Sequence, residues 1–168
     1  MLATGERNDL DFKFNTTAFR MFNVYGRRQS LENPYQGVVS IFIGNVLREE
    51  PIVIYGDGKQ SRDFVHIKDV ARVWISSINN KKTYGKVYNI GSGKRISINK
   101  LVDIILKSFG KSRKNYKVIY KKERPGDQKH MQADISELKK VLNWKPEINF
   151  EQGMKDTIEW AKEEYKLK

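Results

Sequence analysis

The order of hydrophobic and polar side chains predicts helices in several parts of the chain. Residues 38–48 carry apolar side chains at the spacing of one helix face, and Pro51 ends that helix. A second apolar face follows Ser97, whose hydroxyl can cap a helix, and Gly110 marks its end. The apolar positions of these two helices are Val39, Phe42, Ile43, Val46 and Leu47, then Ile98, Leu101, Val102, Ile105 and Phe109. Both segments are predicted to be amphipathic helices that pack on a core.

The pattern predicts three more helices. Residues 69–79 place Val70, Val73, Trp74 and Ile78 on one stripe. Two later helices begin at pairs with the three-residue spacing of a capping box. These pairs are Asp134 with Glu137 and Asn149 with Gln152, and the apolar positions behind them are Leu138, Val141, Leu142, Met154, Ile158, Ala161 and Tyr165.

Short runs rich in β-branched and aromatic residues lie between these helices and predict strands. The run over 12–25 is apolar on both faces at its C-terminal end, which suits a strand buried on both sides in a parallel sheet. Shorter strands are predicted over 87–90 and 116–120, and loops over 26–37 and 124–132. Because strands and helices alternate without a linker or repeat, the sequence predicts one α/β unit.

A Gly-Asp-Gly turn follows the apolar run that ends at Tyr55. Gly56 and Gly58 allow the positive φ angles of a tight reversal, and the Asp57 side chain can accept a hydrogen bond from its own backbone. A later Gly-Ser-Gly at 91–93 resembles a phosphate-binding loop, but it is short and lacks the lysine of such loops, so it is interpreted as a turn.

Arg62 stands just past the Gly-Asp-Gly turn, between two short apolar runs. A guanidinium held on a strand offers two parallel hydrogen bonds to a phosphate or carboxylate. The side chain could equally be solvated, or paired inside the protein with Asp57 or Asp63. The residues around Arg62 alone do not decide between these possibilities.

Composition excludes several classes of protein. The 39% hydrophobic content fits a folded globule, and the absence of cysteine excludes disulfides and thiolate zinc sites. No apolar run has the length of a membrane span, and the first residues lack the apolar segment of a signal peptide, so a cytoplasmic protein without a membrane partner is expected. The net charge of +12 raises the question of nucleic-acid binding, but the sequence contains no nucleic-acid-binding signature. The excess charge is interpreted as a solvated surface.

Six motifs, in order, resemble the substrate-binding half of UDP-glucose 4-epimerases and related NDP-sugar enzymes, which are extended short-chain dehydrogenase/reductases. The longest is Tyr-Gly-Asp-Gly-x-Gln-x-Arg-Asp-Phe-Val-His-Ile-x-Asp-Val over residues 55–70. The others are Arg20-x-Phe22-Asn23-Val24-Tyr25-Gly26, Asn33-Pro34-Tyr35-x-Gly37-Val38-Val39-Ser40, Tyr88-Asn89-Ile90-Gly91-Ser92-Gly93, Arg124-Pro125-Gly126-Asp127 and Ala133-Asp134-Ile135-Ser136.

The resemblance implies a small mixed α/β substrate-binding lobe over residues 12–168, after a segment 1–11 outside the family. The family's other lobe is a Rossmann domain that binds NAD at a glycine-rich turn and carries a Tyr-x-x-x-Lys pair. This chain has no Gly-x-x-Gly-x-x-Gly, and no tyrosine precedes Arg20. The resemblance therefore predicts at most one strand of the Rossmann sheet, no bound NAD and no epimerase activity in this chain alone.

By the same resemblance, eight residues would bind a UDP-sugar and one would lie near NAD. Asn23 would hold the sugar diphosphate, Arg62 and Arg124 would contact its phosphates from opposite sides, and Asp127 would accept from a ribose hydroxyl or order Arg124. Val39, Val53 and Tyr55 would line the uracil slot. Met131 stands where the family varies between tyrosine and a small residue, which leaves UDP-glucose, UDP-galactose and the N-acetyl sugars open. Phe22 would approach the nicotinamide.

Several of these residues also have a structural alternative. Asn23 could satisfy backbone groups, and Tyr55 and the two valines could belong to the core. His66 and His130 have no partners that suggest a metal site. For the whole chain, the alternatives are a lobe completed by a separate Rossmann chain and a non-catalytic module that forms homo-oligomers through exposed apolar surface.

Overall fold

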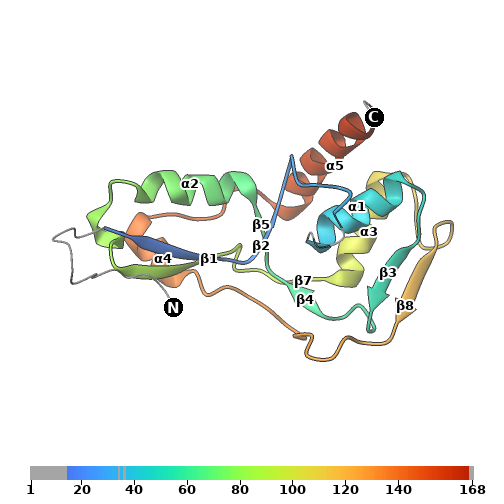
Figure 1. Cartoon of the computed structure of the whole chain (residues 1–168), viewed down its shortest axis with the longest axis horizontal. Coiled ribbons are helices and arrows are strands. Elements are labelled where there is room, and N and C mark those ends of the chain that lie inside the picture. Colours follow the sequence, from blue (N-terminus) through green and yellow to red (C-terminus); the bar gives the residue numbers. More distant parts are fainter. Residues whose placement is uncertain (1–14, 34, 36, 167–168) are drawn as a thin grey trace.

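The computed structural model describes residues 15–33, 35 and 37–166, and Figure 1 shows an elongated molecule with a group of elements at each end. One end holds β1 (Thr17–Met21), β6 (Lys86–Ile90), α2 (Ile67–Ser77) and α4 (Ser136–Leu142). The other holds α1 (Val38–Leu47), β3 (Ile52–Tyr55), α3 (Ile98–Ser108) and β8 (Val118–Lys121). The elements between and beside these groups are β2 (Asn23–Tyr25), β4 (Ser61–Arg62), β5 (Phe64–His66), β7 (Ile96–Ser97), a 3₁₀ turn (Lys81–Thr83) and α5 (Phe150–Lys166).

The described strands form four two-stranded sheets. β1 with β6, β2 with β5, and β3 with β8 are parallel pairs, whereas β4 with β7 is antiparallel. Helices connect the parallel partners, as parallel pairing requires. The predicted mixed α/β lobe is confirmed, and the described residues contain no complete Rossmann sheet.

The first predicted strand differs from expectation in continuity and burial. Its residues 12–14 and the predicted segment 1–11 lie outside the described residues. The remainder divides into β1 and β2 at Phe22, whose backbone N–H donates to the carbonyl of Ile90 at 2.9 Å. Tyr25 at the end of β2 is buried, but Met21 in β1 is 48% exposed. Burial on both faces is therefore wrong for β1, because the consecutive residues Arg20 and Met21, which point to opposite faces of the strand, are both exposed.

Two hydrophobic clusters hold the molecule together. The first joins α1, β3, α3 and α5, and its fully buried members include Ile43, Ile52, Leu101, Ile105 and Met154. The second joins α2, β5, β6 and α4, and includes Val65, Val73, Ile90 and Leu138. The segment from β4 to β5 runs between the two clusters (Figure 1) and carries Arg62.

The helix predictions hold for α1 and α3 and need correction for α2. Ser97 caps α3 by accepting from the Lys100 N–H at 3.2 Å, and Gly110 has the expected positive φ of 67°. In α2, however, Trp74 and Ile78 are 51% and 67% exposed. The buried stripe runs through Val70, Val73 and Ser77. Trp74 follows Val73 and Ile78 follows Ser77, so each exposed side chain is rotated by about 100° from a buried one.

The two predicted capping boxes form only in part. Asp134 accepts from the Ser136 N–H at 3.0 Å, and α4 starts at Ser136, so Glu137 is too early in the helix to complete a box with it. Asn149 accepts from the Glu151 N–H at 2.9 Å at the start of α5. Each of these two side chains thus accepts a hydrogen bond from the backbone N–H two residues later, at the point where the loop ends and the helix begins.

Candidate functional site

The Gly-Asp-Gly turn forms as predicted at the end of β3. Gly56 and Gly58 have φ angles of 82° and 74°, and Asp57 accepts from the Lys59 N–H at 2.9 Å. The turn places the end of β3, at Tyr55, beside the end of β8, because these strands are parallel with Tyr55 opposite Lys121.

A pocket of about 700 Å³ opens beside this strand end. Six of the predicted site residues line it: Asn23, Val53, Tyr55, Arg62, Arg124 and Asp127. They come from β2, β3, β4 and the loop after β8. The fold therefore brings together side chains that are spread over more than a hundred positions of the sequence.

Arg62 is the most tightly held cation in the pocket. Its side chain is 14% exposed and forms an ion pair with Asp127. It also donates to the carbonyl oxygens of Gln128 at 2.6 Å and Ser61 at 3.0 Å. The internal partner of Arg62 is thus Asp127, and neither Asp57 nor Asp63. These bonds fix the guanidinium in position and leave it at the pocket wall.

Asp63, the neighbour of Arg62, has a structural role. Its buried carboxylate accepts from the Ser92 N–H and hydroxyl, the Gly93 N–H and the Ala133 N–H, at 2.6 to 3.0 Å. The Gly-Ser-Gly segment therefore directs its backbone donors at a carboxylate of the protein itself. This arrangement agrees with its interpretation as a turn.

Arg124 lies over the face of Tyr55, with its guanidinium carbon 3.9 Å from the ring centroid. Arginine stacked on an aromatic ring keeps its charge while its orientation is restricted. Hydrogen bonding to Arg124, followed by that residue's positive charge, lowers the pKa of Tyr55. The pocket therefore has one guanidinium held by a carboxylate and a second held by an aromatic ring.

Asn23 lines the pocket and also satisfies the backbone. Its amide donates to the carbonyl oxygen of Asp63 at 3.2 Å. One half of the amide is thereby fixed in orientation, and the same bond joins β2 to the segment between β4 and β5.

Three predicted site residues do not line this pocket. Val39 is 2% exposed and belongs to the first hydrophobic cluster. Phe22 packs against the second cluster. The Met131 backbone N–H donates to the carbonyl of Ser61 at 3.1 Å, which attaches the loop after β8 to β4.

The pocket also has lining residues that the sequence reasoning missed. They are Tyr35, Val38, Ile41, Phe42, Asn45, Ile54, Gln60, Ile98, Pro125 and Gly126. Helical spacing could have identified some of them. Positions 38, 41 and 45 each lie one residue before a buried position of α1, so they share one side of that helix next to its buried face. Gln60, Pro125 and Gly126 stand inside the quoted motifs.

Tyr55 and Lys59 have the four-residue spacing of the Tyr-x-x-x-Lys pair, but the structure separates their side chains. The turn lies between them, and Lys59 faces Asp57 at 3.8 Å. Lys59 lines a different, polar pocket behind the turn, beside Glu123 and His130. The spacing therefore does not produce a proton-transferring pair here.

The described residues contain no Gly-x-x-Gly-x-x-Gly turn before a helix, the feature that binds the pyrophosphate of NAD in a Rossmann domain. Three of the described helices begin directly after a glycine or a strand, as a pyrophosphate site would require: α1, α2 and α3. However, Gly37 stands alone before α1, and the side chains of His66 and Ser97 cap α2 and α3. The described part of the chain also has no cluster of three or more potential metal ligands, and it has no helix long and apolar enough to cross a membrane.

Comparison with known proteins identifies the class. The family model described as GDP-mannose 4,6-dehydratase matches residues 9–157. The chain therefore belongs to this family of NDP-sugar epimerases and dehydratases, which are extended short-chain dehydrogenase/reductases.

Individual relatives are epimerases. A putative UDP-glucose 4-epimerase of Methanocaldococcus jannaschii is 40% identical over 85% of this chain and 44% of its own length. The crystal structure of UDP-glucose 4-epimerase from Thermotoga maritima with UDP-glucose superimposes with a TM-score of 0.83, at 32% identity over 92% of this chain and 48% of that one. UDP-glucuronic acid 4-epimerase from Bacillus cereus, in complex with UDP-glucuronic acid and NAD, gives 0.81 at 31% identity over the same shares. The chain thus spans about half the length of these relatives.

Proposed function

We propose that this chain is the C-terminal, UDP-sugar-binding lobe of a UDP-glucose 4-epimerase-like enzyme. The observation that carries the proposal is the pair of oriented guanidinium groups, Arg62 held by Asp127 and Arg124 stacked on Tyr55, in one pocket. Two fixed cations in one pocket suit the two phosphates of a nucleotide diphosphate.

The remaining lining residues support the other parts of such a ligand. Val53, Ile41 and Phe42 form an apolar wall that suits the flat face of a base. Asn23 lies on the β2 side and would reach the sugar or its adjoining phosphate. Asp127 would accept from the ribose while it continues to orient Arg62.

The net charge of the segment that precedes Arg124 supports an anionic ligand. Residues 107–122, which include β8, contain seven cations and no acid: Lys107, Lys111, Arg113, Lys114, Lys117, Lys121 and Lys122. Such a concentration of positive charge attracts a diphosphate and accelerates its association.

Epimerisation would require a second lobe that supplies NAD as the hydride acceptor. NAD is bound together with UDP-glucuronic acid in the related epimerase structure from Bacillus cereus. The residues described here would bind and orient the nucleotide sugar for that lobe. Because Met131 lies outside the lining of the pocket, the sugar remains open among UDP-glucose, UDP-galactose and the N-acetyl forms.

Isothermal titration calorimetry with UDP, UDP-glucose and UDP-N-acetylglucosamine tests the proposal. Arg62→Ala is expected to weaken binding by at least about tenfold, because a hydrogen bond to a charged group contributes about 1.5–3 kcal/mol. Arg95→Ala, which removes an exposed cation outside the pocket, is the matched control and should bind normally. A folded wild-type chain that fails to bind at millimolar UDP, or equal binding by both variants, would refute the proposal.

A second candidate function is an interaction module, and exposed apolar side chains favour it. Trp74 and Ile75 on α2 are 51% and 70% exposed, and Ile78 at its C-cap is 67% exposed. A groove of about 460 Å³ runs between Trp74, Ile78 and Phe19 of β1. An apolar face of this kind suits a second copy or a complementary Rossmann chain.

Light scattering after size-exclusion chromatography separates these alternatives. If the face joins two copies, a Trp74→Ser/Ile78→Ser variant should elute as a monomer while the wild type elutes as an oligomer. Tyr165→Ser, which removes an exposed aromatic ring from α5, is the control and should leave the mass unchanged. A wild type that is already monomeric, and that binds UDP stoichiometrically, would contradict self-association.

A further inference from the structure

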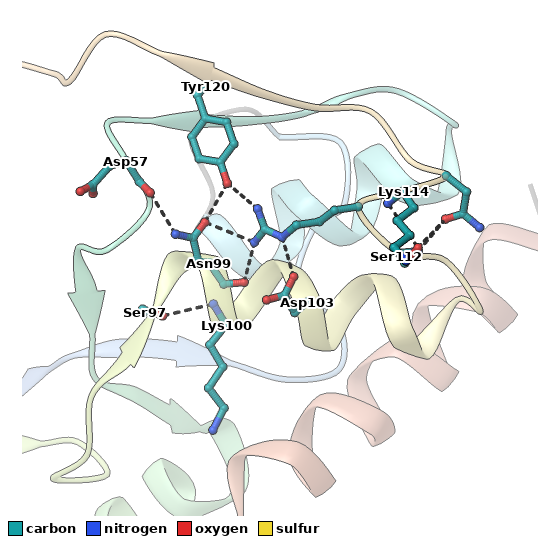
Figure 2. A network of polar contacts seen from close by, with 10 residues as sticks. Asp57, Ser97, Asn99, Lys100, Asp103, Ser112, Lys114 and Tyr120 are labelled. Carbon is teal, nitrogen blue, oxygen red and sulfur yellow. Dashed lines mark hydrogen bonds and ion pairs between the residues drawn. The ribbon is translucent and has the colours of Figure 1, made fainter.

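A polar network fixes the Gly-Asp-Gly turn to α3, and Asn99 is at its centre (Figure 2). The Asn99 backbone N–H donates to the Gly58 carbonyl, and its side-chain amide donates to the Asp57 carbonyl, both at 2.9 Å. Its side-chain oxygen accepts from the Tyr120 hydroxyl at 3.0 Å. The turn lies against this side chain so closely that a Cβ on Gly58 would be 2.3 Å from the Asn99 oxygen.

Arg113 extends the network to β8 and to the next turn of α3. Its Nε donates to Asp103 at 2.6 Å, one terminal nitrogen donates to the Tyr120 hydroxyl, and the other donates to the Asn99 carbonyl at 2.9 Å. All three guanidinium nitrogens therefore have partners. Asp103, Tyr120 and Asn99 converge on one point between α3 and β8 in Figure 2.

The stacked pair of the pocket, Tyr55 and Arg124, lies at the end of β3 and in the loop just after β8. Tyr55 immediately precedes the turn, and Arg124 follows Lys121, the residue opposite Tyr55, by three positions. The Gly56 N–H also donates to the Lys121 carbonyl at 2.9 Å. Asn99 contacts both the turn and Tyr120 of β8, so loss of these contacts can shift the turn relative to β8 and thereby move Tyr55 relative to Arg124.

We propose that Asn99 and Arg113 are positioning residues that set the Tyr55–Arg124 stack and thereby the affinity of the pocket for a nucleotide diphosphate. The inference rests on the proposed function and deepens it. Neither residue lines the pocket, so neither can act by touching the ligand. Their effect has to pass through the turn and β8.

The experiment compares Arg113→Ala, Asn99→Ala and the milder Tyr120→Phe, which removes only the hydroxyl shared by Arg113 and Asn99. Lys114→Ala is the matched control, because it removes a neighbouring exposed cation whose side chain has no partner in the network. Unfolding midpoints and far-UV circular dichroism establish that each variant is folded. If the two alanine variants fail this check, Tyr120→Phe alone decides the outcome.

The first measurement is the ¹H–¹⁵N resonance of the Arg124 Nε–H in the ligand-free protein. In the wild type the Tyr55 ring lies over this guanidinium and shields it. Network variants should move the resonance toward its position in a Tyr55→Ala variant, while Lys114→Ala should leave it unchanged. An unmoved resonance in every folded network variant would overturn the inference.

The second measurement is UDP binding. Arg113→Ala should weaken it about tenfold, the equivalent of one charge-assisted contact. In an Arg124→Ala background the same change should weaken it less than about twofold, because the residue to be positioned is gone. Equal losses in both backgrounds would show a general structural effect and overturn the inference. A wild type that binds no UDP would refute the proposed function and the affinity part, while a moved resonance would still establish the positional part.

Discussion

Replacement of Asp63 by asparagine should destabilise the lobe severely while it changes almost no volume. The Asp63 side chain is fully buried, and each of its oxygens accepts two hydrogen bonds. An asparagine keeps one accepting oxygen and presents an NH₂ group where the other oxygen was. That NH₂ group would face two donors, from Ser92 or from Gly93 and Ala133, whichever way the amide turns.

The magnitude follows from the two bonds that are lost. Hydrogen bonds to a charged group contribute about 1.5–3 kcal/mol each, so the variant should lose about 3–5 kcal/mol after local relaxation. This is a large part of the roughly 5–15 kcal/mol by which domains are stable. With a urea dependence of about 2 kcal/mol per molar, the unfolding midpoint should fall by about 1.5–2.5 M.

Urea unfolding followed by circular dichroism measures this change. Asp57→Asn is the matched control, because Asp57 is exposed in the turn and asparagine can accept from the Lys59 N–H in the same way. Its free energy of unfolding should change by less than about 0.5 kcal/mol. A loss below about 1 kcal/mol for Asp63→Asn, with an unchanged urea dependence, would refute the assignment of Asp63 as the acceptor that joins these segments.

Two further predictions concern glycine and histidine. Gly58→Ala should lower the free energy of unfolding by about 1–2 kcal/mol more than Gly85→Ala. Both glycines have a positive φ, but only a methyl group at position 58 would meet Asn99. Equal losses of the two variants in urea unfolding would contradict that contact. Burial lowers the pKa of His66, so the unfolded chain binds the proton more readily and stability should fall as the pH drops below about 6.5. His66→Asn, which keeps an acceptor for the Lys68 N–H, should lose that part of the acid sensitivity in urea titrations at about pH 5.5 and 7.5, and an unchanged profile would show that another group is responsible.

Local patterns predicted the elements whose signals lie within one segment. The apolar spacing of α1 and α3, the Ser97 cap and the Gly-Asp-Gly turn all follow from side chains a few positions apart. Such predictions succeed because the backbone geometry of a turn or helix is set locally. The residues that meet in the pocket, such as Tyr55 and Arg124, were instead predicted from the resemblance of their motifs to a known family.

The errors concern contacts between distant segments. The pattern in α2 does not show that the buried stripe passes through Ser77 and leaves Trp74 exposed, since that depends on where β5 and α4 pack. The sequence likewise offered Asp57 and Asp63 as nearby partners for Arg62. The observed partner is Asp127, brought close by the loop after β8.

The parallel pairing of β3 with β8 also has a consequence for how the molecule folds. The two strands are separated by more than sixty residues, and the ion pair of Arg62 with Asp127 spans a separation of 65. Contacts of such long range form slowly, because a large loop must close before they stabilise anything. During synthesis, β3 can therefore pair with β8 only after residues 118–127 have left the ribosome. The pocket lined by Tyr55, Arg62 and Arg124 should be among the last parts of the lobe to form.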